Sequence, residues 1–187
     1  MYVNGFIIQE LVENGYKGVD GSGFSSNTGK NWYLSFRDDY ASEFDPHYDE
    51  EICKYEWIMD PHTWVGACTD IEYIRRYISV SKKLGIKYRL MVVMTDIPNP
   101  SMELPPDIEL RFVGYDYAYE TPDNYSAVYN EIPFVFPEFK LNENGLFETR
   151  EELEEYLKKR EEFEKTHPPY TLEVGDFTIF KVFETDL

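Results

Sequence analysis

Residues 69–95 read TDIEYIRRYISVSKKLGIKYRLMVVMT, a helical pattern followed at once by a strand pattern. Thr69 and Glu72 have the spacing of a capping box, in which a hydroxyl and a carboxylate each accept a hydrogen bond from an amide at the helix start. Two apolar stripes then continue to about Leu84, and Gly85 supplies the left-handed residue that ends many helices. A helix with two apolar stripes is expected to be deeply buried.

The second half of this stretch, residues 87–95, is nearly continuous in apolar character. Strands that are covered on both faces have this composition, whereas a half-exposed strand alternates between apolar and polar residues. We therefore predict that residues 87–95 form the central strand of a sheet. The helix that precedes it is expected to lie directly on that sheet.

The connection that follows is rich in proline, with Pro98, Pro100, Pro105 and Pro106. Proline removes a backbone donor and restricts the residue before it, so an extended, non-helical connection is predicted. A strand is expected to resume at Ile108. Its tyrosines at alternate positions should share one face, opposite to Phe112, unless Gly114 hosts a bulge that resets the alternation.

A second capping box, Thr149 with Glu152, predicts a helix that continues to about Lys165 and ends before Pro168 and Pro169. Seven glutamates of this helix are balanced by five basic residues, as expected of a solvated face with local ion pairs.

Shorter signals complete the chain. Alternation in residues 32–36 predicts a strand, and the glycine-rich residues 15–30 predict a surface loop without regular elements. Gly175 and Asp176 are typical of a two-residue hairpin turn between strands at 171–174 and 177–183.

The order of these elements predicts one α+β domain over residues 1–187, with a mixed or antiparallel sheet and two main helices. A hydrophobic fraction of 42% and an aromatic fraction of 17% exclude a disordered acidic tail. The sequence shows no internal repeat.

Charge is the strongest constraint on partners. The chain has 36 acidic and 18 basic residues, a formal net charge of −18, and residues 37–60 hold nine acids against two bases. Such a surface repels nucleic acid and anionic membranes, so neither is expected to bind, while basic proteins are attracted to it.

No cofactor, metal site or catalytic residue is predicted. Cys53 and Cys68 have neither a CxxC nor a metal-type spacing, which favours free thiols, although a disulfide between them stays open. His47 and His62 each have an acid two residues away, a spacing that defines no ligand set. The N-terminus lacks the pattern of a signal peptide, so a cytoplasmic location is predicted.

Two groups of residues are predicted to bind a partner. Acids would steer the encounter and tyrosines would provide buried anchors, because tyrosine combines a large rigid contact area with a polar tip. The acids are Asp38, Asp39, Glu50 and Glu51, and the second group comprises Tyr115, Asp116, Tyr117, Tyr119, Tyr125 and Tyr129. The alternative is that these tyrosines pack under a helix.

Residues 114–117, GYDY, and 125–131, YSAVYNE, in a small, strongly acidic α+β chain resemble immunity proteins that neutralise bacterial polymorphic or contact-dependent toxins. The resemblance implies a protein that binds a cognate toxin tightly, often a basic nuclease, without catalysis. It transfers no functional residue to this chain.

The sequence therefore predicts an acidic protein-binding module, an immunity or antidote type of inhibitor with a basic partner such as a toxin domain. Two alternatives stay open. A mimic of nucleic-acid charge would carry its acids along a ridge, and a carboxylate-dependent hydrolase would gather them in a pocket.

Overall fold

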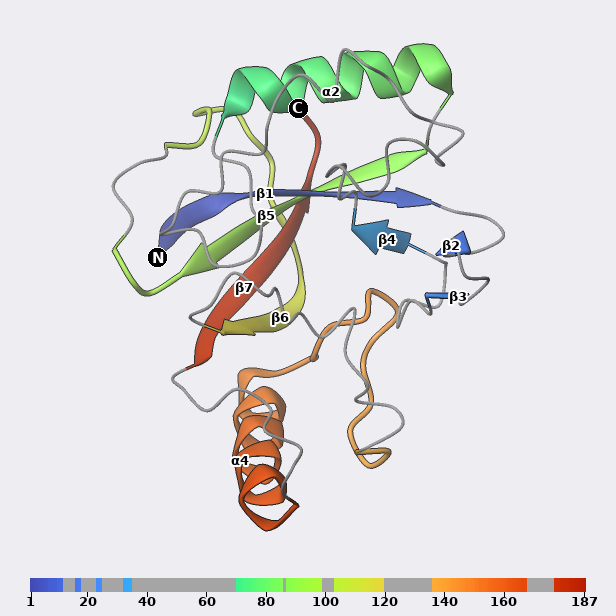
Figure 1. Ribbon diagram of the computed structural model, residues 1–187. Coiled ribbons are helices and arrows are strands. Elements are labelled where there is room, and N and C mark those ends of the chain that lie inside the picture. Colours follow the sequence, from blue (N-terminus) through green and yellow to red (C-terminus); the bar gives the residue numbers. More distant parts are fainter. Residues whose placement is uncertain are drawn as a thin grey trace.

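A five-stranded antiparallel sheet forms the centre of the computed structural model, with strand order β4-β1-β5-β7-β6 (Figure 1). The structure describes residues 1–11, 16–17, 23–24, 32–34, 70–85, 87–98, 103–119, 136–167 and 177–187. The sheet strands are β1 (Tyr2–Leu11), β4 (Trp32–Leu34), β5 (Tyr88–Thr95), β6 (Arg111–Tyr119) and β7 (Phe177–Thr185). The helices are α2 (Ile71–Leu84) and α4 (Arg150–Thr166). The predicted α+β class with two main helices is confirmed, and the sheet is antiparallel.

The central position of β5 is confirmed, because β1 and β7 pair with it on its two sides. Alternate side chains of β5 pack in two different clusters. Leu90 and Val92 join Ile74 and Tyr77 of α2 in one core cluster, and Met91 lies in another that includes residues of β1, β6 and β7. Burial on both faces accounts for the continuous apolar run of the sequence.

Helix α2 begins at Ile71, and the amide of Glu72 donates to the Asp70 carboxylate at 2.9 Å. Asp70 thus serves as an acceptor for the first turn, the role that the sequence assigned to Thr69, which lies outside the described residues. The helix ends at Leu84 as expected, with Gly85 in a left-handed conformation at φ +70°.

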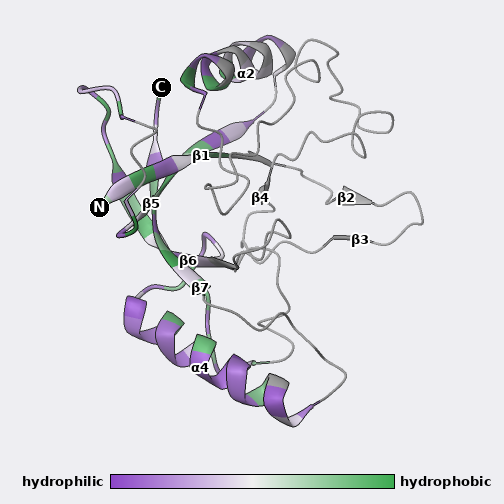
Figure 2. Ribbon diagram, turned by 60° about the vertical axis from the view of Figure 1, so that its left-hand side comes forward, coloured by the Kyte–Doolittle hydropathy of each residue, from purple (hydrophilic) through white to green (hydrophobic). Residues whose placement is uncertain are grey.

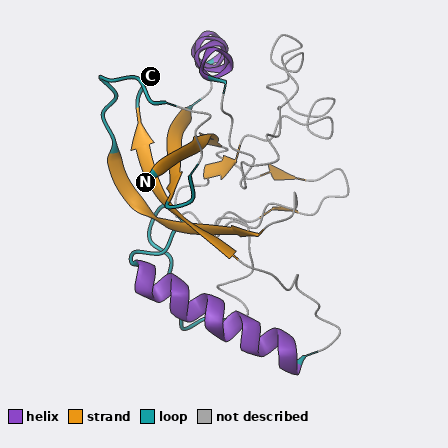
Figure 3. Cartoon of the chain, turned by 90° about the vertical axis from the view of Figure 1, so that its left-hand side faces the viewer, coloured by secondary structure: helices purple, strands orange, loops and turns teal. Residues whose placement is uncertain are grey.

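Helix α4 has the predicted capping box. The Glu152 amide donates to the Thr149 hydroxyl at 3.2 Å, and the Thr149 amide donates to the Glu152 carboxylate at 3.2 Å. Figure 2 shows α4 as mainly hydrophilic with a few hydrophobic residues. Leu153 and Tyr156 of this helix are buried in a cluster that includes residues of β6 and β7. In Figure 3, α2 and α4 lie beside different parts of the twisted sheet.

Strand β6 departs from the simple alternation predicted for it. It begins at Arg111 rather than Ile108, whose amide instead donates to the Pro105 carbonyl at 3.2 Å in a turn. A bulge between Phe112 and Gly114 shifts the pairing with β7, and Gly114 has φ +149°. The conditional expectation of a bulge at Gly114 is therefore confirmed.

The N-terminal strand and a small second sheet were not expected. Strand β1 pairs with β5 and β4, and β2 (Tyr16–Lys17) pairs with β3 (Gly23–Phe24) inside the segment predicted to lack regular elements. The predicted strand at 32–36 is present as β4. The hairpin signal at 175–176 lies outside the described residues, although β7 follows it at Phe177.

Candidate functional site

Most of the predicted binding residues lie outside the described part of the chain. This holds for Asp38, Asp39, Glu50, Glu51, Tyr125 and Tyr129, and also for Cys53, Cys68, His47 and His62. Tyr119 is the last residue of β6, but its side chain is not described. The residues that the structure does place are Tyr115, Asp116 and Tyr117 of β6.

Tyr117 lies in a buried aromatic cluster between β6 and α4. Its side chain is 0% exposed, and its ring centroid lies 5.6 Å from those of Tyr156 and Phe177. The two tyrosine hydroxyls are 3.1 Å apart, so either can donate to the other. The alternative that these tyrosines pack under a helix is thus confirmed for Tyr117.

Arg160 of α4 brings a guanidinium group into the same cluster. Its Nη1 atom donates to the Tyr117 hydroxyl at 3.2 Å, and its guanidinium lies 5.2 Å from the centroid of the Phe177 ring. The residue is 3% exposed, so its contacts are formed out of water, where cation–π attraction and charged hydrogen bonds are strongest. The cluster therefore joins α4 to the sheet through polar as well as apolar contacts.

Asp116 and Tyr117 are not exposed interface anchors, which corrects the prediction for these two residues. Asp116 is 4% exposed and accepts a hydrogen bond at 2.9 Å from the Tyr117 amide. A side chain that the fold already buries cannot contact a second protein unless the fold opens. Neither residue can supply contact area from this conformation.

The described aromatic surface beside them is instead formed by Phe112 and Tyr115. Phe112 is 46% exposed, and its ring packs edge to face against Tyr115 at 5.2 Å and Phe183 at 5.6 Å. Tyr115 is half-buried, so part of its side chain can still contact a partner, as predicted for this residue. The signal that would have identified Phe112 is Gly114, because the bulge brings Phe112 to the same face as the tyrosines.

A turn at residues 142–147 holds the outer edge of β6. Tyr115 and Phe147 exchange two backbone hydrogen bonds of 2.9 and 3.0 Å, and the side-chain amide of Asn142 donates to the Val113 carbonyl at 2.9 Å. The Asn142 side-chain oxygen also accepts from the amides of Asn144 and Leu146. Asn142 thereby fixes the turn and joins it to the bulged part of β6.

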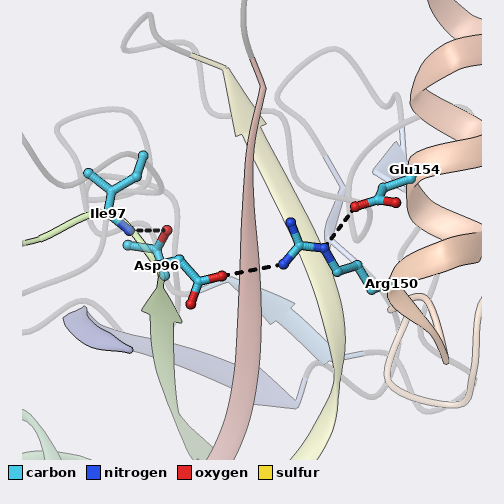
Figure 4. A network of polar contacts seen from close by, with 5 residues as sticks. Asp96, Ile97, Arg150 and Glu154 are labelled. Atoms are coloured by element: carbon cyan, nitrogen blue, oxygen red, sulfur yellow. Dashed lines mark hydrogen bonds and ion pairs between the residues drawn. The ribbon is translucent and has the colours of Figure 1, made fainter.

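The charges of α4 are paired locally, as the sequence predicted. Lys159 lies 3.5 Å from Glu155, and Lys165 forms a 2.5 Å pair with Glu161. Figure 4 shows that Arg150 binds two carboxylates, Glu154 of the same helix and Asp96 beyond the end of β5. Such pairs contribute little to stability, but they reduce the negative potential of α4.

Titration of Tyr117 provides a test of the buried cluster. Burial, followed by the neighbouring Tyr156, raises the pKa of Tyr117 well above its ordinary value of 10.0. Because the folded chain holds this proton more tightly than the unfolded chain, the contribution to stability is complete below about pH 10 and is lost as the pH rises further. Urea unfolding between pH 8 and 11.5 should show this loss.

The matched control is Tyr117→Phe, in which the loss above about pH 10 should be shallower. Burial lowers the pKa of Arg89 to about 10, which changes stability in the opposite direction but acts in both proteins. Equal slopes in the two proteins would contradict the assignment to Tyr117.

Within the described residues, no group of three or more histidine, cysteine or acidic side chains is arranged to hold a metal ion. Neither described helix combines the length and the apolar composition that crossing a membrane requires. Comparison with known proteins finds no matching family model, no matching curated protein and no matching solved structure.

Proposed function

We propose that this protein is an acidic protein-binding module, an antidote or immunity type of inhibitor that acts in the cytoplasm on a basic partner such as a toxin domain. The observation that carries the proposal is the net charge of −18 on a chain that also folds around an aromatic core. A folded domain needs a net charge of only about 2 to 8 in magnitude for solubility, so the excess calls for a separate explanation.

The distribution of charge supports a localised binding surface. Residues 70–87, which include α2, hold five basic and two acidic residues, and in α4 the glutamates Glu154, Glu155 and Glu161 form ion pairs with basic residues of the same helix. Residues 37–60, by contrast, hold nine acids and two bases. A basic partner is therefore attracted to that segment more strongly than to either helix.

Charge reversal tests where the partner is steered. The partner would first be captured from the source lysate at low salt and purified, and its association rate measured over a salt series. Converting Asp38, Asp39, Glu50 and Glu51 to lysine should slow association at low salt by about tenfold or more, because like charges then face each other. The protein should stay folded, since charged side chains are rarely buried in folded proteins.

A second quadruple variant keeps the same net charge and serves as the control. It converts Glu103, Asp107, Glu109 and Asp186, all exposed in the structure, to lysine. Association should slow much less in this variant. Equal slowing in both would show that overall charge, and not residues 37–60, attracts the partner.

The identity of what binds decides between the functions. Capture of a DNA-binding enzyme whose DNA site is blocked would favour a mimic of nucleic-acid charge. Absence of any basic partner together with turnover of a small substrate would overturn the proposal in favour of a carboxylate hydrolase.

A further inference from the structure

The β1–β5 and β6–β7 ladders, which flank the central β5–β7 pairing, have the same register. Each contains eight residue pairs, which run from Tyr2 opposite Thr95 to Glu10 opposite Tyr88 in β1–β5, and from Arg111 opposite Glu184 to Tyr119 opposite Phe177 in β6–β7. A shift of 109 residues (2 to 111) converts β1 into β6, and a shift of 89 residues (95 to 184) converts β5 into β7. Under these shifts every pair of the first ladder becomes a pair of the second.

The irregularities of the two ladders also correspond. The pairing shifts between Val3 and Gly5 in β1 and between Phe112 and Gly114 in β6. Both glycines have φ +149°, a conformation that L side chains rarely adopt. The two bulges lie at the same position in their ladders and have the same glycine conformation. This agreement is informative, because a bulge is a specific local feature and not a general property of strands.

A two-fold axis relates the two halves at the centre of the sheet. Gly5 pairs with Val93, Val93 with Val182, and Val182 with Gly114, so both bulge glycines lie in one row across four strands. The β5–β7 pairing obeys the same relation, because Val92 opposite Phe183 exchanges with Met94 opposite Lys181. The axis therefore passes through the pair of Val93 and Val182.

The helices follow the same relation. Helix α2 directly precedes β5, and α4 is the element before β7. Phe6 and Leu90 pack in the cluster that contains α2, and their counterparts Tyr115 and Ile179 pack in the cluster that contains α4. Both helices thus cover the same face of the sheet, as an axis perpendicular to the sheet requires, and the strand twist separates them in Figure 1.

We propose that this protein is built from two copies of one β-α-β unit, residues 1–98 and 103–187, and that the β5–β7 seam is the surface at which each unit docks on the other. The sequence retains little of the relation beyond the bulge, where Gly5-Phe6 corresponds to Gly114-Tyr115. The inference rests on backbone register and packing, and is independent of the proposed function.

The relation also shows where the units have diverged. Asp116 and Tyr117 correspond to Ile7 and Ile8, so the polar cluster with Arg160 belongs to the second unit alone. The predicted acids at 38–51 lie between β4 and α2 in the chain, and Tyr125 and Tyr129 lie between β6 and α4. In chain order, both candidate binding segments therefore come before the helix of their unit.

Residue exchange between the units tests the equivalence in the full chain. Asn4 corresponds to Val113, is 2% exposed, and its side-chain oxygen has no hydrogen-bond partner among the described residues. Asn4→Val should keep the fold and leave Tm unchanged or raise it by a few degrees. The substitution removes a buried acceptor that has no hydrogen-bond partner among the described residues, and it introduces the residue type found at the equivalent position of the other unit. The matched control, Gly5→Val, places the same side chain one position out of frame and should lower Tm by about 6 °C or more.

Native-state hydrogen exchange provides a second test, because local packing alone would not make the amides of one unit exchange together. Under increasing urea, amides of β1, α2 and β5 should exchange as one cooperative group, and those of β6, α4 and β7 as another. The proposal would be overturned if the cooperative groups combined elements of different units, for example if both helices opened together before any strand. An Asn4→Val protein that is as destabilised as Gly5→Val would also overturn it.

Discussion

Replacing Tyr117 by alanine should lower the free energy of unfolding by about 3 to 5 kcal/mol, the range typical of deleting a large buried aromatic side chain. The ring is fully buried between Tyr156 and Phe177, so its removal leaves a cavity at the junction of α4 and the sheet. The substitution also removes the acceptor of the Arg160 Nη1 hydrogen bond, which adds a desolvation penalty. Urea denaturation monitored by circular dichroism measures the loss.

Phe112→Ala is the matched control, since it deletes an aromatic ring from the same strand at a position that is 46% exposed. Its cost should stay near 1 kcal/mol or below, because most exposed substitutions change stability little. Weaker partner binding by a Tyr117 variant would then reflect loss of the fold. Weaker binding by a Phe112 or Tyr115 variant would instead indicate loss of contact at the surface. A Tyr117→Ala protein as stable as Phe112→Ala would refute the buried assignment.

The parts of the fold that sequence periodicity predicted are those in which local pattern and tertiary environment agree. Strand β5 is mainly apolar because it is covered on both faces, and α4 begins directly after its N-cap Thr149 because its capping box is satisfied locally. Strand β1 escaped recognition for the opposite reason. Asn4 and Gly5 interrupt its alternation at a bulge. This bulge can be recognised only from the pairing of β1 with β5, which the sequence of β1 alone does not contain.

The residue types of the candidate site could be predicted from the sequence, but which of their side chains are exposed could not. The row of tyrosines on one face of β6 follows from alternation, yet alternation does not state whether solvent or a helix covers that face. Arg160 was equally hidden in the sequence, since it reads as one of the balanced charges of α4 while its guanidinium is buried beside Tyr117. Long-range contacts decide such cases, and single-sequence patterns do not contain them.

The internal two-fold relation illustrates the same limit. Backbone register depends on which residues pair, so two units can keep eight matching pairs while their side chains diverge, as Tyr117 and Ile8 have done. The positions that resist divergence are those where the backbone itself requires a residue. Gly5 and Gly114 are positions of this kind.

Gly114→Ala should therefore be among the most damaging small substitutions in the chain, lowering the free energy of unfolding by about 2 to 6 kcal/mol from backbone strain and overpacking together. At φ +149° an L residue is strained, and an added Cβ would lie 2.7 Å from the Leu146 Cβ and 2.9 Å from the Phe147 carbonyl oxygen. Relief requires the 142–147 turn to move away from β6, which breaks the two backbone hydrogen bonds between Tyr115 and Phe147.

Gly85→Ala separates the two causes of this loss, because Gly85 also has positive φ, +70°, but nothing lies within 4 Å of an added Cβ. Its cost should be only about 1 to 2 kcal/mol, the penalty of the left-handed conformation alone. Hydrogen exchange at the amides of Tyr115 and Phe147 should accelerate in Gly114→Ala and stay unchanged in Gly85→Ala. Equal losses of stability in the two variants, with these amides still protected, would show that the turn does not depend on the close approach at Gly114.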